Sequence, residues 1–296
     1  MIREIGRMGT DPFVADQIFL GGAMPGCRIA EAIRLKHKPV ALHWSDDKPE
    51  NVVQFDKGSW GCVMFLVVAA AKGKIAVLDR DTCGCVGGAV GMGFGNRYPD
   101  FPGGIDCFYH FLSSGNERWE KGREEIRKME PFASRKEFLD HYAHGEGYKK
   151  TPGLVKYMVD RMPMMEIPKR YVIFKPLGDT FTEAEAPVTV TFLVNADQLA
   201  GLVVLANYGR PGFENVSIPF VAGCQAVGIL PYREAKSEAP KAVVGNIDIS
   251  ARFYTRKTLG KDMLSFTVPF AMFREMEENV EGSFLTRTQW NNLLET

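Results

Sequence analysis

The sequence predicts a mixed α/β fold in which two related αβ halves flank an α-helical insertion. Short strand-like runs alternate with helix-like runs in residues 1–95 and again in residues 169–296, an order typical of an α/β protein. The intervening residues 96–168 are instead rich in charged and aromatic side chains. The segments around the cysteines of the two flanking parts also resemble each other. We therefore expect three units with these boundaries, the middle one covering the core of the other two.

The first part contains predicted elements of both kinds. Apolar residues in a helix-like pattern predict a helix over 29–35, after a turn-like, glycine-rich segment over 21–26. Continuous apolar runs predict a strand over 40–44, a helix over 62–72 and a strand over 74–78. Residues 79–95 are so rich in glycine that we expect their backbone to approach another group closely.

The insertion and the second half follow in order. A charged stretch over 117–130 and a helix-like pattern near 154–162 predict the helical insertion. Asp197 is the expected N-cap of a helix that runs through Leu205. The remaining elements expected in the second half are strands over 171–174, 188–194, 243–244 and 264–268, a helix-like stretch within 218–232, and a helix over 270–279.

The composition excludes several classes of protein. The 296 residues include 36 basic and 36 acidic side chains, and no basic stripe of the kind that binds nucleic acid is evident. The longest apolar run, 63–71, has nine residues, fewer than half of the ~20 that a membrane-spanning helix needs. The N-terminal residues lack the apolar region of a secretory signal. We therefore expect a cytoplasmic protein with neither a nucleic-acid nor a membrane partner.

The cysteines are the first candidates for chemistry. Six in 296 residues are too few for a disulfide framework, and clustered cysteines in a reducing compartment point to metal or redox chemistry. Cys62 and Cys224 each follow a glycine and precede a predicted helix, whose N-terminus favours the metal-binding thiolate. Cys83 and Cys85 lie in the glycine-rich segment, whose amides can donate to cluster sulfurs or to an anion. The spacing matches neither a zinc ribbon nor a ferredoxin, and free cysteines are also common as small buried hydrophobes.

The sequences of the two halves are similar around these cysteines. In each half a Gly-Cys pair precedes a helix-like stretch that leads to a strand. Cys85 follows Cys62 by 23 residues, and Asp248 follows Cys224 by 24. A duplicated unit folded about a pseudo-twofold axis would bring these four positions together, so that each half donates two ligands to one shared site. Chance similarity between two strand-loop-helix units is the alternative explanation.

Other polar and sulfur-containing residues carry weaker signals. Cys27 and Cys107 stand alone, and we expect them to be structural. His141 and His144 are three residues apart, close to Glu146; this spacing can hold a metal, although it is also typical of a solvated helix end. No P-loop, Gly-x-Ser-x-Gly motif or Ser-His-Asp arrangement can be picked out.

Four segments in this order resemble domain-of-unknown-function family 169, which occurs in archaea and bacteria, many of them anaerobic. The resemblance spans roughly Pro39 to Asn279, and no single motif is diagnostic. The segments are 62–71, the block 85–93 (CVGGAVGMG), the stretch from Gly223-Cys224 to Pro231-Tyr232, and Ser250-Ala251-Arg252 followed by FTVPF over 266–270.

The resemblance implies a ligand set. The family pattern has a cysteine before the first helix, one in a Cys-Pro-Gly-Gly block, one before the later helix and one ahead of a Gly-Ser-Arg turn. These positions correspond to Cys62, Cys85, Cys224 and Asp248 here. The pattern favours Cys85 over its neighbour in the glycine-rich segment. An aspartate at the fourth position departs from it and leaves Cys83 as the alternative fourth ligand.

Three thiolates and a carboxylate can hold an iron-sulfur cluster, and we expect a 4Fe-4S cluster in preference to a 2Fe-2S one. A carboxylate is a harder and more weakly held ligand for iron than a thiolate, so the Asp248 corner would be exchangeable. That iron could then bind a substrate as a Lewis acid, or Asp248 could simply shift a redox potential. Arg252 is a candidate to bind an anionic substrate through its guanidinium, with a structural ion pair as the alternative.

These expectations leave several functions open. The first is a redox or lyase-type enzyme of anaerobic metabolism, acting on a small anionic substrate or exchanging electrons with a redox partner protein. The second is a non-catalytic metal-binding sensor or accessory protein. The third is a metal-free α/β protein that binds a small anion at the glycine-rich segment. The sequence predicts no oligomeric state.

Overall fold

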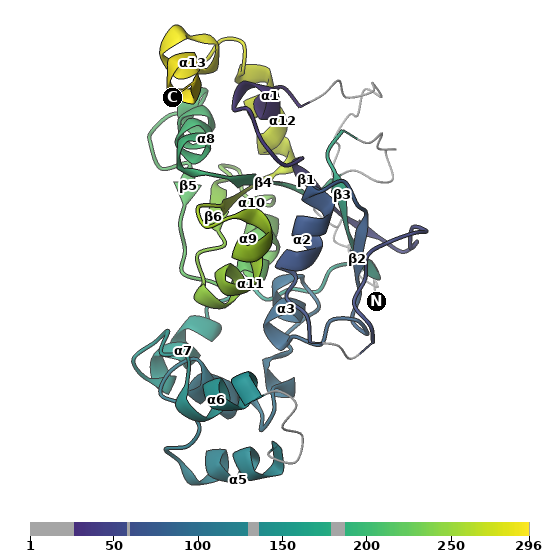
Figure 1. Cartoon of the computed structure of the whole chain (residues 1–296), viewed down its shortest axis with the longest axis vertical. Coiled ribbons are helices and arrows are strands. Elements are labelled where there is room, and N and C mark those ends of the chain that lie inside the picture. The colour runs from purple at the N-terminus through teal and green to yellow at the C-terminus, as the bar shows by residue number, and fades with distance from the viewer. Residues whose placement is uncertain (1–26, 58–59, 130–135, 179–186, 296) are drawn as a thin grey trace, which may run out of the picture.

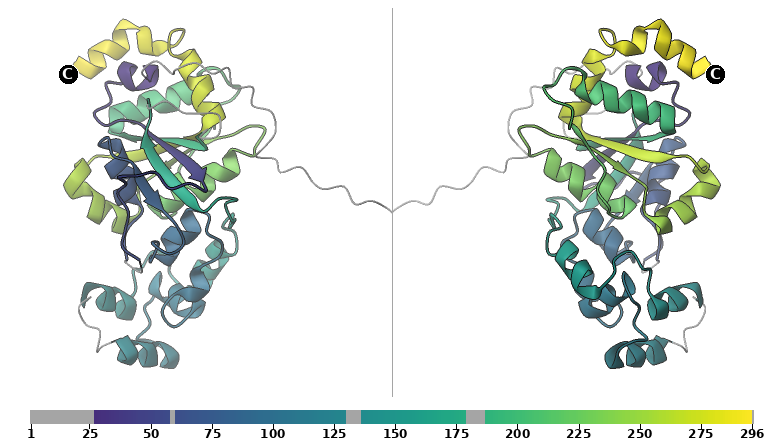
Figure 2. Two further views of the ribbon diagram at one scale, coloured as in Figure 1. Left: turned by 90° about the vertical axis from the view of Figure 1, so that its right-hand side faces the viewer. Right: turned by 90° about the vertical axis from the view of Figure 1, so that its left-hand side faces the viewer.

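The computed structural model describes residues 27–57, 60–129, 136–178 and 187–295. In these ranges a seven-stranded sheet carries helices on both faces, and a group of further helices projects from one side (Figures 1 and 2). The predicted mixed α/β class is confirmed. The turn expected over 21–26 lies outside the described residues.

The sheet has the order β2-β3-β1-β4-β7-β6-β5. All neighbouring strands are antiparallel except β5 and β6, which are parallel. Every residue of β4 is buried, as expected for a central strand covered on both faces. The strands are β1 (Val40–Ser45), β2 (Ala76–Leu78), β3 (Tyr171–Pro176), β4 (Thr189–Val194), β5 (Val216–Ser217), β6 (Ala242–Gly245) and β7 (Leu264–Pro269).

The strand order is similar on the two sides of the central β1–β4 pair. On one side the chain runs from the central β1 to the outer β2 and returns to β3 between them. On the other side it runs from the central β4 to β6 and returns to β7 between them. A duplicated unit would produce this order of strands. The sequence repeat itself stays a prediction.

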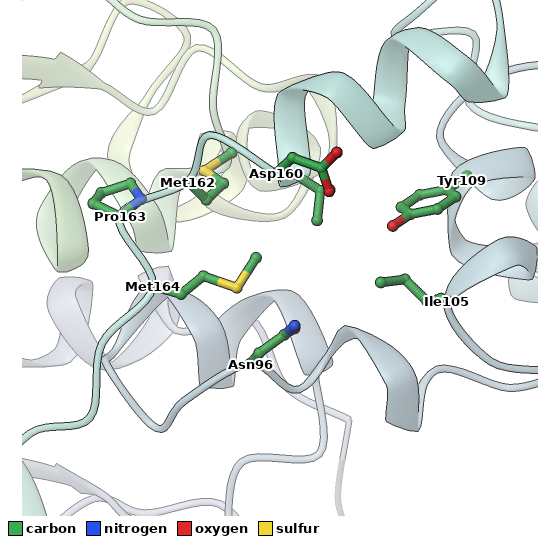
Figure 3. Close-up of a pocket in the computed structure, with 8 residues that line it drawn as sticks. Asn96, Ile105, Tyr109, Asp160, Met162, Pro163 and Met164 are labelled. Carbon is green, nitrogen blue, oxygen red and sulfur yellow. The ribbon is translucent and has the colours of Figure 1, made fainter.

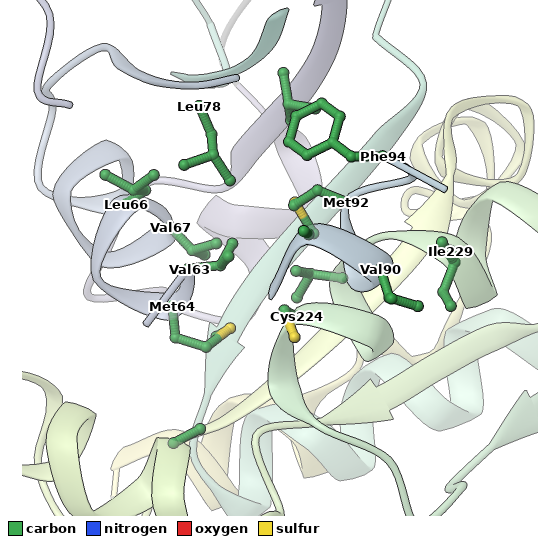
Figure 4. Close-up of a cluster of buried hydrophobic side chains, with 14 of the residues drawn as sticks. Val63, Met64, Leu66, Val67, Leu78, Val90, Met92, Phe94, Cys224 and Ile229 are labelled. Atoms are coloured by element: carbon green, nitrogen blue, oxygen red, sulfur yellow. The ribbon is translucent and has the colours of Figure 1, made fainter. Parts of the chain in front are cut away.

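One face of the sheet is covered by the helices that carry the candidate cysteines. These helices are α2 (Met64–Ala71), α3 (Val86–Gly91), α9 (Gly223–Val227), α10 (Ile229–Glu234) and α11 (Ile249–Leu259). Helix α2 has the sequence MFLVVAAA and buries six of its eight residues, because it has no polar side. Figure 4 shows Cys224 beside Val63 and Met64 in the apolar cluster under this face.

The opposite face is covered by α1 (Arg28–Ala32), α8 (Ala196–Tyr208), α12 (Phe270–Asn279) and α13 (Thr288–Glu295). Helix α8 begins two residues earlier than expected, because Asn195 and not Asp197 is its N-cap. The Asn195 side chain accepts from Gln198 N at 2.9 Å, and the Gln198 side chain accepts from Asn195 N at 3.0 Å, which completes a capping box. Within the described ranges, none of the helices combines the length and the apolar character needed to cross a membrane.

The segment between α3 and β3 is helical, as predicted. It contains the 3-10 turn η1 (Tyr98–Asp100) and the helices α4 (Ile105–Phe111), α5 (Glu120–Met129), α6 (Lys136–His144) and α7 (Pro152–Val159). Figure 1 shows it at the end of the molecule opposite α13. Buried aromatic residues of this segment, among them Tyr98 and Tyr142, join the same apolar cluster as α2. The helical segment therefore packs directly on the face that carries the cysteines.

Two glycine-rich stretches fold differently from the expectation. Residues 86–91 of the glycine-rich segment form helix α3. The helix-like stretch within 218–232 is two short helices, separated at Gly228 (φ −120°, ψ −104°). A Cβ at position 228 would lie 2.0 Å from Gly91 O. This close backbone approach lets α9 lie against α3, and it explains why glycine stands at the break.

Candidate metal centre

The four residues implied as ligands all lie at the N-terminal ends of helices. Cys62 stands two residues before α2, and Cys85 is the N-cap of α3. Cys224 is the second residue of α9, and Asp248 is the N-cap of α11. Cys224 interacts electrostatically with the other three. Segments more than a hundred residues apart in the chain therefore meet in one region, as the sequence predicted.

Backbone contacts hold Cys85 and Cys224 close together. The Cys224 thiol donates to Gly87 O at 3.3 Å, and Gly88 N donates to Cys85 Sγ at 3.4 Å. A Cβ at position 91 would lie 2.9 Å from Cys224 Sγ. The glycines of α3 thus allow α9 to bring its sulfur against the backbone of the first half.

Asp248 joins the two helices of the second half. Its side chain is buried at 7% exposure. Oδ1 accepts from Ala251 N and Oδ2 from Gly223 N, each at 2.7 Å. The first bond caps α11 and the second anchors the start of α9. Burial raises the pKa of Asp248, and the two amide bonds oppose that shift. Each carboxylate oxygen keeps a free lone pair, so capping leaves a donor for a metal.

Cys83 belongs to the same region. Its thiol donates weakly to Cys85 O at 3.6 Å, and a Cβ at Gly88 would lie 3.3 Å from its sulfur. It also interacts electrostatically with Cys224. Both candidates for the fourth ligand, Cys83 and Asp248, are therefore present at the site.

Burial makes all four thiols poor acids. It raises the pKa of Cys62 to about 12 and also raises the pKa of Cys83, Cys85 and Cys224. Backbone amides lower the pKa values of Cys62, Cys83 and Cys85 by a smaller amount, for example Met64 N at Cys62. The expectation that helix N-termini favour the thiolate is wrong for the metal-free chain, because desolvation outweighs the amide contacts. Metal binding to these sulfurs would displace protons.

The side chains of the candidate ligands lie in one region, but they do not form a compact site for a single metal ion. Among the residues that the structure describes, no three or more His, Cys, Asp or Glu side chains are grouped so that they could hold a metal ion. The donor chemistry is nevertheless that of an iron-sulfur site, because buried cysteine sulfurs and nearby backbone amides are what holds such clusters. The residues present therefore fit the expected group in chemistry.

Arg252 has a set of backbone partners. Its guanidinium donates to the carbonyl oxygens of Asn246, Lys261 and Met263. These bonds join the end of β6 to the turn before β7. A role for Arg252 in binding an anionic substrate stays a prediction.

Of the remaining cysteine and histidine candidates, His141 lies near the site, with its Nδ1 3.4 Å from Glu146 Oε1. Cys27 caps α1 and donates from its thiol to Glu277 Oε1 at 2.9 Å. Cys107 is buried in α4, within the helical segment. His144 Nδ1 lies 3.3 Å from a carboxylate oxygen of Glu117 at the end of α6. The structural roles predicted for the two cysteines and the weak ligand signal of the two histidines stay predictions.

A polar group that the sequence did not reveal closes one side of the site. Tyr148 Oη lies 2.9 Å from Ser250 Oγ, and Ser250 Oγ lies 3.2 Å from Glu146 Oε2. Glu146 interacts electrostatically with Asp248 and Cys85. The partners are 102 and 104 residues apart in the chain, so no local pattern could have paired them.

The helical segment also contacts the loop that leads to Cys62. The ring centroids of Trp60 and Phe138 lie 5.4 Å apart. Together with the contacts of Glu146 and Tyr148 to α11, this gives the helical segment two separate points of contact around the cysteines. The segment therefore borders the cysteine region at two places.

Comparison with known proteins identifies a family. Residues 28–279 match the sequence profile of domain-of-unknown-function family 169, described as uncharacterised ArCR. The chain belongs to family 169. The match runs from the first residue of α1 to the last residue of α12. It therefore includes all the residues that were considered as metal ligands in this family 169 protein. No protein of curated function and no solved structure matches it.

The fold explains both departures of this family 169 chain from the Cys-Pro-Gly-Gly and fourth-cysteine pattern. Val86 is the first residue of α3, a position where proline and other residues are interchangeable because the N–H has no partner within the helix. Asp248 is an N-cap, where aspartate is among the preferred residues. Neither substitution disturbs the backbone that carries the site.

A cleft in the helical segment of the family 169 chain lies apart from the candidate ligands. It has a volume of about 400 Å³ and lies between η1, α4 and the end of α7 (Figure 3). The polar and thioether side chains that line it include Asn96, Tyr109, Asp160, Met162 and Met164. None of the cysteines lines it.

Proposed function

We propose that this family 169 protein is a cytoplasmic redox protein that binds an iron-sulfur cluster through Cys62, Cys85 and Cys224. A 4Fe-4S cluster with Asp248 at its fourth corner is the form we favour. The observation that supports the proposal is the meeting of three free thiols, one buried and two half-buried, from both halves of the chain near the ends of three helices. Each ligand of an iron-sulfur cluster binds a different iron atom. The ligands therefore surround the cluster, and their side chains need not converge on one point as they do around a single metal ion.

The surrounding residues have defined tasks in this proposal. When bound, the cluster supplies one-electron transfer or, at an exchangeable iron, Lewis-acid chemistry. Gly88 N donates to Cys85 Sγ, a contact that tunes the potential of a cluster by stabilising charge on sulfur. Asp248 offers a hard oxygen already held by two amides, which makes its corner the most easily exchanged.

Burial favours electron transfer over substrate chemistry. Cys224 is 8% exposed, and the helical segment covers the site from two directions. An electron can cross a thin layer of protein, whereas a substrate needs an open path. All six cysteines are free, which suits a reducing compartment. Lyase-type chemistry on an anion held by Arg252 is the second candidate, and a substrate-dependent change in the EPR spectrum would support it.

Anaerobic purification with quantification of iron and sulfide tests the proposal. We expect brown protein that contains both elements. Cys62→Ser, Cys85→Ser and Cys224→Ser should each lose most of the iron, because each removes a thiolate ligand. Cys27→Ser and Cys107→Ser are matched controls that should retain it. Full iron content in the first three variants, or colourless protein with stoichiometric zinc, would contradict the proposal.

The fourth ligand is tested with a second pair of variants. If Asp248 is the ligand, Asp248→Ala changes the EPR spectrum of the cluster while Cys83→Ser leaves it unchanged. Asp248→Cys should then hold the cluster more tightly and reduce exchange at that iron. The reverse pattern in the first two variants would assign the fourth position to Cys83.

A further inference from the structure

An exposed apolar patch flanked by lysines lies on the surface next to the cysteine region. Its apolar members are Ile249 and Phe253 of α11 and Phe220 of the loop before α9, with exposures of 68%, 48% and 40%. Lys149 and Lys257 flank them. We call these five residues the α11 patch.

Two contacts connect Phe220 to α11 through Tyr148. The rings of Phe220 and Tyr148 meet edge to face with centroids 5.8 Å apart. Tyr148 in turn contacts Ser250, the neighbour of Ile249. Ile249 and Phe253 are four residues apart on one helix and therefore share a side of it.

The charge of the patch has one sign. The three segments that form it, 148–150, 216–222 and 249–259, contain five basic residues and no acidic residue, although the whole chain has 36 of each kind. Lys149 Nζ lies 5.2 Å from the centroid of the Phe220 ring, and Lys257 Nζ lies 5.6 Å from that of Phe253. The patch therefore combines exposed apolar side chains with a positive rim, which an acidic protein surface complements.

The patch lies directly outside the proposed cluster site. Ile249 follows Asp248 in the chain, and Phe220 precedes Cys224 by four residues. The Tyr148–Ser250 contact, which joins the two parts of the patch, also belongs to the polar group beside Asp248. A protein docked on the patch would stand close to the candidate ligands without needing an open channel to them.

We propose that the α11 patch docks an acidic one-electron carrier protein that exchanges electrons with the site. The inference rests on the proposed function. In each transfer the reduced carrier loses one electron and the protein-bound cluster gains it, with no bond made or broken. Apolar residues at the centre with charges at the rim are typical of small, transient protein interfaces. They are less suited to nucleic acid, whose phosphates call for charges across the whole contact.

Stopped-flow electron transfer from a reduced, acidic 2Fe-2S ferredoxin tests this proposal. The Lys149→Glu/Lys257→Glu double variant should slow the second-order rate about tenfold or more at low salt, and much less at high salt, because steering between surface charges is screened. Ile249→Ser should slow it at both salt concentrations. Lys121→Glu on α5 is the matched control: Lys121 also lies over an aromatic ring, 5.9 Å from that of Trp119, but far from the sheet (Figure 1).

The measurements separate failure of the patch from failure of the cluster. Iron and sulfide are quantified for every variant, and the thermal unfolding midpoint shows that each is folded. If the wild-type chain lacks iron, the proposed function fails, and carbodiimide crosslinking of the metal-free chain to the ferredoxin still tests docking through the two lysines. Equal rates in the patch variants and the control would overturn the docking proposal. The docking proposal would also be overturned if the patch variants kept the wild-type rate with ferredoxin but lost self-association or RNA binding. Either loss would assign the patch to a different partner.

Discussion

The two faces of the sheet are built in different ways. Helix α8 on one face has 13 residues and a complete capping box, and its neighbours bury aromatic side chains such as Phe266 and Phe273. On the cysteine face, α3 has six residues, three of them glycine, and α9 has five. Side-chain packing organises the first face, whereas on the second face the contact between α3 and α9 depends on close approach of their backbones.

This difference shows how the cysteine region is assembled. A glycine contributes no buried side chain, and in a helix it costs up to about 1 kcal/mol relative to alanine. At Gly91 and Gly228 the missing side chains let α3 and α9 touch, which places Cys224 against the first half. Apolar packing of α2 and of the helical segment surrounds this contact between backbones.

The largest expected effect is a loss of stability that leaves the reactivity of the cysteine thiols unchanged. Phe266 is fully buried in the cluster beneath α8 and α12. Phe266→Ala should lower the free energy of unfolding by about 3–5 kcal/mol, through lost burial and a new cavity. Urea denaturation measures the loss, and native thiol reactivity should stay as in the wild type. Faster thiol reaction in the folded variant would show that the two faces are not independent.

A smaller effect is expected on the cysteine face, with the opposite signature. Gly228→Ala places a Cβ against the carbonyl oxygen of Gly91 and should cost about 1–3 kcal/mol. Because α9 must then move away from α3, the thiol of Cys224 should become more reactive.

Gly201→Ala in α8 is the matched control for that variant. The three atoms nearest to its Cβ all belong to the Trp290 ring, the closest at 2.5 Å, and a side chain can shift more easily than a backbone. It should destabilise the protein less than Gly228→Ala and leave the thiols unchanged. An equal loss of stability in both variants would contradict the distinction between the two faces.

The smallest expected effect concerns pH. Burial raises the pKa of Tyr148, beside the site, from 10.0 to about 12. Its neutral form is therefore favoured by folding, and the stability it contributes is lost as the pH rises from 10 towards 12. The free energy of unfolding of Tyr148→Phe should therefore fall less than that of the wild type over this pH range. We expect a difference of less than about 1 kcal/mol, because the Tyr148 side chain is partly exposed. Parallel stability curves for the two proteins above pH 10 would disprove the shift.

Much of the framework could be predicted from local patterns. The apolar runs around Val40, Val190 and Phe266 became strands, and the apolar run after Cys62 became α2. The start of α8 was misplaced because Asn195 and Asp197 are both good caps, and the reciprocal bond to Gln198 decided between them.

Other features depend on partners distant in the chain. A glycine-rich run such as 86–91 has low intrinsic helix preference, and α3 exists because α9 packs against it. The contact of Glu146 and Tyr148 with Ser250 likewise joins segments about a hundred residues apart. Neither could be predicted from a window along the chain.

Local sequence patterns were enough to predict the fold class, the family and the helix that follows Cys62. These depend on apolar periodicity, capping residues and glycine, whose effects extend over a few neighbouring residues. The raised pKa values of the thiols, the anchoring of two helices by Asp248 and the contacts of the helical segment around the site became visible in the tertiary structure alone. Desolvation and long-range hydrogen bonds depend on everything packed around a group, and no short stretch of sequence contains that information.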